Sequence, residues 1–179
     1  MSHGGGDILA YKGILPKLGA DVFVASGAKV IGDVEIGERA SIWFNCVLRG
    51  DVHEIRVGKG TNIQDGTVVH VTHDRYGTYI GDDVLIGHKA MIHGCVLEDR
   101  AFVGLGSIVM DGCVIEGDGM LAAGALLPPG KRIGKGELWK GWPARFARKL
   151  SAEEIAELQK GPPYYADLAA TYLEAARDE

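Results

Sequence analysis

Aliphatic residues recur at every sixth position along most of this 179-residue chain. One interval, from Leu48 to Val57, is three residues longer, and the interval that contains THDRYGTY is five residues longer. One later interval, from Ile92 to Leu97, is only five residues long. Small or β-branched residues usually stand four places after each of these positions, and glycine often follows directly. Seventeen positions, which we call the markers, follow this rule: Val24, Val30, Ile36, Ile42, Leu48, Val57, Ile63, Val69, Ile80, Ile86, Ile92, Leu97, Val103, Val109, Ile115, Leu121 and Leu127.

A six-residue period fits neither a helix, with a period of 3.6, nor a long alternating strand, but it fits short strands joined by tight turns. A β-sandwich is the alternative, and its strands recur at variable spacings near 8 to 12 residues. The regular hexads resemble the left-handed parallel β-helix family, in which three hexads form one triangular coil. We therefore expect an all-β solenoid. The left hand follows from the resemblance, because the general crossover rule favours right-handed connections.

The hexads divide the chain into three regions. Residues 1–20 are expected to form an N-terminal lead-in, residues 21–135 the repeat, and residues 136–179 a C-terminal α-helical tail. Ser151 and Glu154 form the S-x-x-E capping box of a helix over SAEEIAELQK. Gly-Pro-Pro then breaks this helix before YYADLAATYLEAAR, whose apolar stripe predicts a second one. We expect the tail to pack along the solenoid or on a neighbouring subunit.

Three histidines gain a geometric relation from the hexad count. Val69 and Ile92 are three hexads apart, so they occupy the same face on successive coils. His70 and His93 each follow one of these markers, so their side chains should stack outward with backbones about 4.8 Å apart. His88 lies one face back and does not easily join them within one chain. In a cyclic trimer, however, His88 of one chain can face the other two histidines of the next.

Three imidazoles and an open fourth position form the ligand set of a catalytic zinc site. Imidazoles also suit Fe²⁺ and Co²⁺. The same count places Arg49 in the column of His70, and Gln64 and Asp65 beside His88. Polar residues therefore accumulate on the two strips that would meet in a trimer.

Four short motifs make the chain resemble the γ-class carbonic anhydrases: R-G-D at 49–51, N-I-Q-D at 62–65, His70, and G-H-x-x-x-x-H-G at 87–94. The resemblance runs from about residue 10 to the C terminus. It implies that His70 and His93 bind zinc from one subunit and His88 from its neighbour. It also implies a homotrimer with metal sites at the subunit interfaces. The activity implied is that of a lyase, the hydration of carbon dioxide to bicarbonate.

The same resemblance assigns roles to four further residues. Gln64 would hydrogen-bond the water at the metal, Arg49 would pair with Asp65 across the interface, and Asp51 would help to order the region. The alternative for Arg49 and Asp65 is a salt bridge that only assembles the trimer. Asp51 and Gln64 could equally be corner or interface residues, and the three histidines could be unrelated surface imidazoles.

The chain departs from the family prototype along the path for proton export. The prototype carries glutamates directly after the residue equivalent to Asp51 and three residues after the first histidine ligand. This chain has Val52 and His73 at those places. An imidazole titrates near neutrality, so His73 is a candidate proton carrier. Its alternative is a solvated loop residue.

Other functions fit parts of the pattern. A hydroxide at the metal could attack a coenzyme A thioester, which some proteins resembling this chain hydrolyse. A hexapeptide acyltransferase would need one catalytic histidine, an open acyl-CoA groove and no metal. A noncatalytic trimeric scaffold could use the metal only to hold subunits together.

Composition narrows the remaining classes. Nineteen basic and 24 acidic residues give a net charge of −5 without a Lys/Arg run, so no nucleic-acid partner is expected. No stretch of 18 apolar residues predicts a membrane span, and the N terminus lacks a signal-peptide pattern, so a cytoplasmic location is expected. Cys46, Cys95 and Cys113 form no C-x-x-C pair, which favours small buried hydrophobes over a thiolate metal site.

Overall fold

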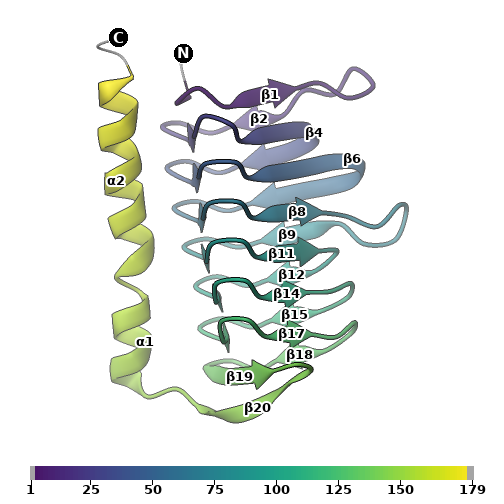
Figure 1. The fold of residues 1–179 in the computed structure, drawn as a ribbon, viewed down its shortest axis with the longest axis vertical. Coiled ribbons are helices and arrows are strands. Elements are labelled where there is room, and N and C mark those ends of the chain that lie inside the picture. Colours follow the sequence, from purple (N-terminus) through teal and green to yellow (C-terminus); the bar gives the residue numbers. More distant parts are fainter. Residues whose placement is uncertain (1–2, 177–179) are drawn as a thin grey trace.

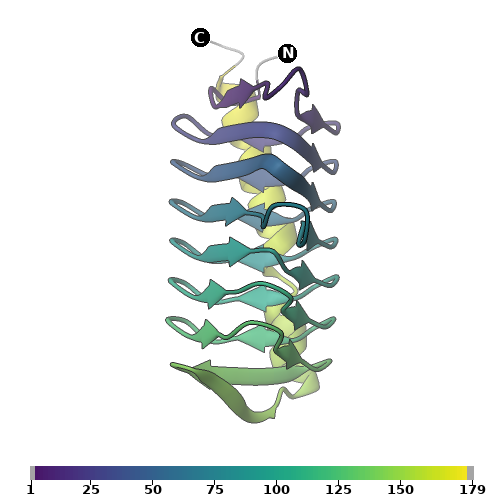
Figure 2. The ribbon, with the colours of Figure 1, turned by 90° about the vertical axis from the view of Figure 1, so that its right-hand side faces the viewer.

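The marker side chains form the interior of a parallel β-solenoid. The computed structural model describes residues 3–176, and its coils stack from the N-terminal to the C-terminal end (Figures 1 and 2). All of the markers are at most 5 % exposed. This burial confirms the prediction that every sixth residue points inward. Neighbouring strands pair in parallel, so each marker lies beside a marker of the adjacent coil.

The strands lie on three faces of the solenoid, and the longest two, β4 and β6, bend from the first face onto the third. The first face contains β1 (Asp7–Leu9), the start of β4 (Lys29–Ile36) and of β6 (Val47–Val57), β8 (Val68–His70), β11 (Met91–His93), β14 (Ile108–Val109) and β17 (Leu126–Leu127). The second contains β3 (Phe23–Val24), β5 (Ser41–Ile42), β7 (Asn62–Ile63), β10 (Leu85–Ile86), β13 (Phe102–Val103), β16 (Met120–Leu121) and β19 (Glu137–Gly141). The third contains β2 (Lys17–Leu18), the ends of β4 and β6, β9 (Thr78–Ile80), β12 (Val96–Leu97), β15 (Val114–Ile115) and β18 (Arg132–Ile133).

Corners between faces combine a left-handed residue with a small buried one. Asn45 has φ 59° and Lys89 has φ 57°. Each directly precedes a fully or nearly buried small residue, Cys46 or Ala90. The left-handed backbone turns the chain, and the small side chain is all that fits inside the sharp corner. This arrangement is the reason for the small residues four places after the markers.

Strand pairing extends beyond residues 21–135 at both ends. Strands β1 and β2 lie within the region expected as a lead-in, and both pair with β4. Within the expected repeat, Ile133 follows the last marker, Leu127, by six residues; it is fully buried and pairs with Ile115. The region expected as a helical tail begins with β19 and with β20 (Ala144–Lys149), which pairs with β19 antiparallel.

Two helices follow the last strand, as predicted. Helix α1 (Ala152–Leu158) begins at Ser151 with both hydrogen bonds of the expected capping box. Helix α2 (Gly161–Ala175) differs from the prediction, because Gly-Pro-Pro forms its first turn instead of a separate break. Proline is tolerated there, since the first N–H groups of a helix have no partner within it. Residue 177, the last of the predicted second helix, lies outside the described residues.

Helix α2 runs back along the solenoid and covers the second face (Figure 1). Its Ala169 and Leu173 are buried in a cluster with Phe23 and Trp43. Tyr165 adds an edge-on contact to Trp43, with ring centroids 5.4 Å apart. The part of the second face formed by β3, β5 and β7 is thereby covered by the chain itself. No helix within residues 3–176 is long and apolar enough to cross a membrane.

The three cysteines are buried and unbonded, in agreement with their prediction as small hydrophobes. Burial raises the pKa of Cys46 to about 12. Burial likewise raises the pKa values of Cys95 and Cys113. The thiols are therefore protonated at neutral pH and unsuited to metal binding.

Replacement of a marker tests the inside-outside assignment. Ile115→Ala removes a fully buried side chain from the core and is expected to lower the free energy of unfolding by about 2–5 kcal/mol. Val114→Ala is the matched control, because the preceding side chain points outward and is half-buried; its effect is expected to stay below about 1.5 kcal/mol. Urea unfolding of both variants measures the difference, and equal losses would contradict the assignment.

Candidate metal centre

His70 and His93 lie side by side on the first face, at the ends of β8 and β11. The two residues are direct partners in the parallel register of these strands, as the hexad count predicts. Their ring centroids are 5.1 Å apart. His70 Nδ1 lies 3.1 Å from His93 Nε2. Two ring nitrogens therefore face each other on the outside of the solenoid.

Two carboxylates hold the other ring nitrogens of this pair. Asp51 Oδ1 is 3.1 Å from His70 Nε2, and Asp111 Oδ1 is 2.6 Å from His93 Nδ1. An ionised carboxylate only accepts hydrogen bonds, so each neutral imidazole places its proton toward its aspartate. The nitrogens that face each other, His70 Nδ1 and His93 Nε2, then both carry lone pairs. Two lone pairs at this separation repel each other unless a cation lies between or beside them.

Electrostatics favour this protonation pattern. Burial lowers the pKa of His70, and the nearby Arg49 guanidinium acts in the same direction against the hydrogen bond to Asp51. Burial opposes ionisation of Asp51, but hydrogen bonds donated by Arg49 and His70 outweigh it and lower its pKa. Neutral pH thus leaves His70 neutral and Asp51 charged, the forms that metal ligation requires.

Asp111 was missing from the sequence-based set. It stands two places after the marker Val109, which pairs with Ile92 on the adjacent coil. Its carboxylate therefore approaches from the next coil, over Gly94. A Cβ at Gly94 would collide with Asp111 Oδ1. The hexad count applied to carboxylates as well as histidines, together with the glycine directly after His93, could have identified it.

His88 lies at a different corner, after β10 of the second face. Its Nδ1 is 2.7 Å from Asp65 Oδ2, so its Nε2 is the nitrogen left for a ligand. Gln64 lies at the same corner on the adjacent coil, because the residues before it and before Gly87, Ile63 and Ile86, are register partners. Gln64 is 4 % exposed, and its amide nitrogen donates to Asn62 Oδ1 over 3.1 Å. The pair of His70 and His93 thus lies at one edge of the first face, and His88 with Gln64 and Asp65 lies at the other.

Within residues 3–176, one chain brings no three His, Cys, Asp or Glu side chains together as a metal-binding group. His88 and His93 belong to corners at opposite ends of β11. Within the described chain, His88 therefore lies apart from the pair of His70 and His93.

The remaining predicted residues take separate positions. Arg49 donates to Asp51 Oδ2 within the chain. Its pairing with Asp65 across an interface therefore stays a prediction. His73 lies in the segment between β8 and β9, and its side chain is 71 % exposed. Its Nδ1 lies 3.1 Å from Oδ2 of the exposed Asp74.

The donor set suits a divalent cation. Each of the three histidines has a carboxylate at one ring nitrogen, which is the usual support of a metal-bound imidazole. Two nitrogens bound to one zinc ion at tetrahedral angles are roughly 3.3 Å apart, given Zn–N distances near 2.0–2.1 Å. The observed separation of 3.1 Å is close to that value.

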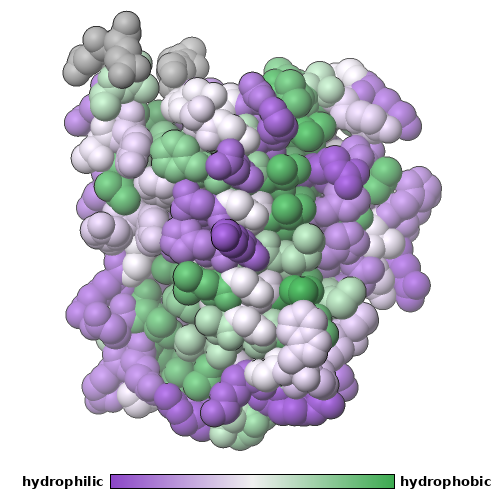
Figure 3. Space-filling view, in the orientation of Figure 1, coloured by the Kyte–Doolittle hydropathy of each residue, from purple (hydrophilic) through white to green (hydrophobic). Residues whose placement is uncertain are grey.

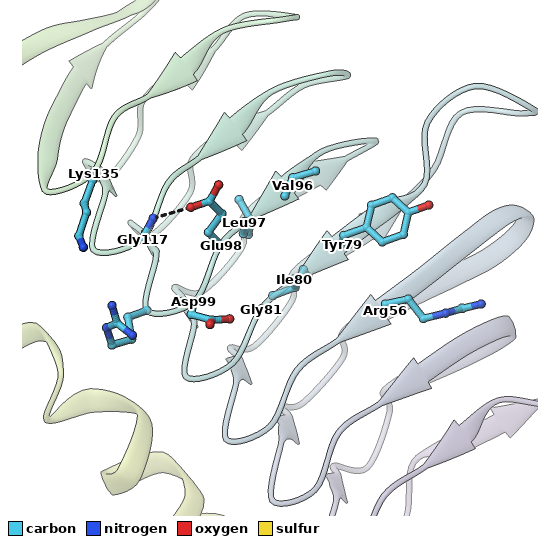
Figure 4. Close-up of a pocket in the computed structure, with 11 residues that line it drawn as sticks. Arg56, Tyr79, Ile80, Gly81, Val96, Leu97, Glu98, Asp99, Gly117 and Lys135 are labelled. Atoms are coloured by element: carbon cyan, nitrogen blue, oxygen red, sulfur yellow. Dashed lines mark hydrogen bonds between the residues drawn. The ribbon is translucent and has the colours of Figure 1, made fainter.

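A groove of about 510 Å³ lies elsewhere, on the third face (Figure 4). Its lining includes Arg56 and Glu98 but none of the three histidines. Glu98 accepts a hydrogen bond from the Gly117 N–H, and Arg56 donates to Asp33 and Glu54. The groove is therefore separate from the predicted site.

Known proteins share this architecture and sequence. A family model described as bacterial transferase hexapeptide (six repeats) matches residues 16–50. A solved structure of a hexapeptide transferase family protein from Anaplasma phagocytophilum is 51% identical and superposes with a TM-score of 0.89, covering 93% of this chain and 98% of that one.

Several relatives carry names with an activity. The chain is 52% identical over 159 residues to gamma carbonic anhydrase 2, mitochondrial, of Arabidopsis thaliana, covering 86% of this chain and 57% of that protein. It thus spans little more than half of the Arabidopsis protein. It is 41% identical over 151 residues to a probable carbonic anhydrase of Methanocaldococcus jannaschii, covering 84% of this chain and 94% of that one. With nearly the whole of that second relative matched, the chain belongs to the γ-carbonic anhydrase family of hexapeptide-repeat proteins.

Proposed function

We propose that the protein hydrates carbon dioxide to bicarbonate at a metal site shared between two chains of a homotrimer. The observation that supports this most directly is the convergence of two imidazole lone pairs, His70 Nδ1 and His93 Nε2, each fixed by a carboxylate on its other nitrogen. Membership in the γ-carbonic anhydrase family supports the reaction. His88, with its free Nε2, is the third ligand and comes from the neighbouring chain.

The uncovered surface beside His70 and His93 supports the assembly. Residues that precede the markers on the first face are apolar on successive coils and partly exposed: Val47, Val68, Met91, Ile108 and Leu126. Figure 3 shows hydrophobic side chains running down this face. This column starts with the charged Asp7 and Lys29 and is apolar from Val47 onward. The equivalent column on the third face starts with Lys17, Glu35 and Arg56 and ends with Arg132. Helix α2 covers β3, β5 and β7 of the second face. The first face is therefore the one suited to contact a second copy.

The metal ion and the chain would supply different parts of the chemistry. When bound, a divalent metal ion would lower the pKa of water to about 7 and so supply hydroxide for attack on carbon dioxide at neutral pH. The chain holds this site through three imidazoles, and Asp51, Asp111 and Asp65 fix the orientation of those rings. Zinc is the proposed metal, and Fe²⁺ or Co²⁺ fits the same donors.

Gln64 and Arg49 have supporting roles in this proposal. Gln64 lies beside His88, and its carboxamide would orient the attacking oxygen by a hydrogen bond from the neighbouring chain. Arg49 keeps Asp51 ionised and in place. It also stands at the edge of the first face, where it can meet Asp65 of the next chain. A cytoplasmic location remains the prediction from the sequence.

Proton removal is the step at which this chain differs from the family prototype. Val52 has no titratable group, whereas His73 is exposed three residues from His70. An imidazole exchanges protons at neutral pH, so His73 carries the proton from the site to solvent in this proposal. The transfer should limit turnover.

Direct assays separate this function from its rivals. Protein purified without oxygen, so that Fe²⁺ would be kept, is analysed for metal and then assayed for carbon dioxide hydration and for acyl-CoA thioester hydrolysis. Metal-dependent hydration is expected. Thioester hydrolysis alone would replace the proposed substrate, acyl transfer without metal would indicate an acyltransferase, and metal without either activity would indicate a scaffold.

Mixed trimers test the shared site. His70→Ala and His88→Ala chains each lack one ligand, so each variant alone should lose most of its bound metal. In a mixed trimer, the interface that joins intact His70 to intact His88 is complete. Random mixing at equal amounts should therefore restore about a quarter of the wild-type metal. Metal analysis measures this recovery, and full metal content in either variant alone would contradict the shared site.

His73→Ala tests the proton path. The variant should hydrate carbon dioxide more slowly while its metal content stays unchanged, because His73 is not a ligand. Small imidazole buffers should raise the turnover of the variant toward that of the wild type. His53→Ala is the control, a histidine outside the predicted site. Turnover that is independent of buffer and survives His73→Ala would remove the shuttle but leave the metal site.

A further inference from the structure

We propose that Asp111 is a positioning residue that fixes the ring of His93 for metal binding, and that Thr72 holds Asp111 in place. The inference rests on the proposed metal site. It adds two residues that are not ligands and that the sequence motifs do not include.

Both oxygens of Asp111 are engaged. Oδ1 lies 2.6 Å from His93 Nδ1, and Oδ2 accepts a hydrogen bond of 2.8 Å from the Thr72 hydroxyl. One bond alone would leave the carboxylate free to rotate about its own axis. The second bond removes that freedom, so the plane of the carboxylate and the direction of the His93 N–H are set together.

The backbone around His93 is shaped for this contact. Gly94 has φ 56° and leaves open the space that Asp111 Oδ1 occupies. An alanine there would collide with the carboxylate and also adopt a strained backbone conformation. Asp111, which supports His93, and Gly94, which leaves space for Asp111, therefore lie on adjacent coils.

The segment between β8 and β9 fastens the two histidines a second time. Directly after it, at the start of β9, the Thr78 hydroxyl donates to the His70 carbonyl oxygen over 2.6 Å and accepts from the Gly94 N–H over 3.0 Å. Thr72 and Thr78 thus connect the two ends of this segment to the backbone or support of both imidazoles. We conclude that the segment orders the metal ligands as well as carrying His73.

Loss of the Asp111 carboxylate should release the His93 ring. The Nδ1–H would lose its charged acceptor, and the ring could then place its proton on Nε2, the nitrogen that must bind metal. Partners of this kind around metal-bound histidines typically change metal affinity by about 10–100-fold. Thr72→Val keeps the shape of the side chain but removes the hydroxyl, so it should cause a smaller loss in the same direction.

The experiment compares Asp111→Asn and Thr72→Val with the wild type and with Asp33→Asn. Asp33 is a similarly exposed aspartate that binds Arg56 on the third face, so it controls for the loss of one charge. Zinc affinity is measured by competition with a chelator. The tautomer of His93 is read from ¹⁵N NMR of the metal-free proteins, which does not depend on metal or activity.

The expected result is a zinc affinity about 10–100-fold lower in Asp111→Asn, with a mixture of His93 tautomers in place of the single Nδ1–H form. Asp33→Asn should match the wild type in both measurements. A wild-type affinity and a single Nδ1–H tautomer in Asp111→Asn and Thr72→Val would overturn the positioning role. If zinc bound equally to the wild type and to His93→Ala, the proposed function would fail, and the tautomer measurement would still decide the role of Asp111.

Discussion

The hydrogen bonds between successive coils are the constraint on which this structure depends. Each short strand pairs in parallel with the strand three hexads away, so residues at equal phase lie directly beside each other. The spacing between such neighbours is that of a β-sheet, about 4.8 Å. A pair of side chains can therefore be brought to ligand distance by their phase alone. No loop has to fold over to make the contact.

This constraint explains how the site can be both rigid and divided. His70 and His93 are positioned by paired strands, and Asp51 and Asp111 reach them from the coils on either side. The corner that separates β10 from β11 places His88 at the other edge of the same face. A triangular coil supplies neighbouring ligands along a column but not across a face. In the proposed site, the third ligand therefore comes from another copy.

Much of this arrangement could be read from the sequence, because the hexad rule is a local pattern with a single geometric meaning. It identified the buried markers, the adjacent histidines and the polar corner at Gln64 and Asp65. The capping box at Ser151 and Glu154 separately identified the helix that follows. It did not identify contacts that depend on side-chain direction, such as Asp111 reaching over Gly94 to His93.

The terminal strands were missed for a different reason. At both ends the repeat is irregular, and β1, β2 and β19 bury no side chain fully but pair with β4 or β16, so the hexad count does not predict them. The Gly-Pro-Pro sequence was similarly ambiguous, because proline both breaks a helix and favours its first turn.

The central claim is that three carboxylate-supported imidazoles from two chains bind one metal ion. X-ray absorption spectroscopy of the metal-loaded protein tests it most directly, because the fine structure counts imidazole ligands without requiring activity. The account predicts three imidazole nitrogens at about 2.0–2.1 Å from zinc, with the remaining position occupied by a lighter oxygen donor. A spectrum with only two imidazoles per metal would contradict it.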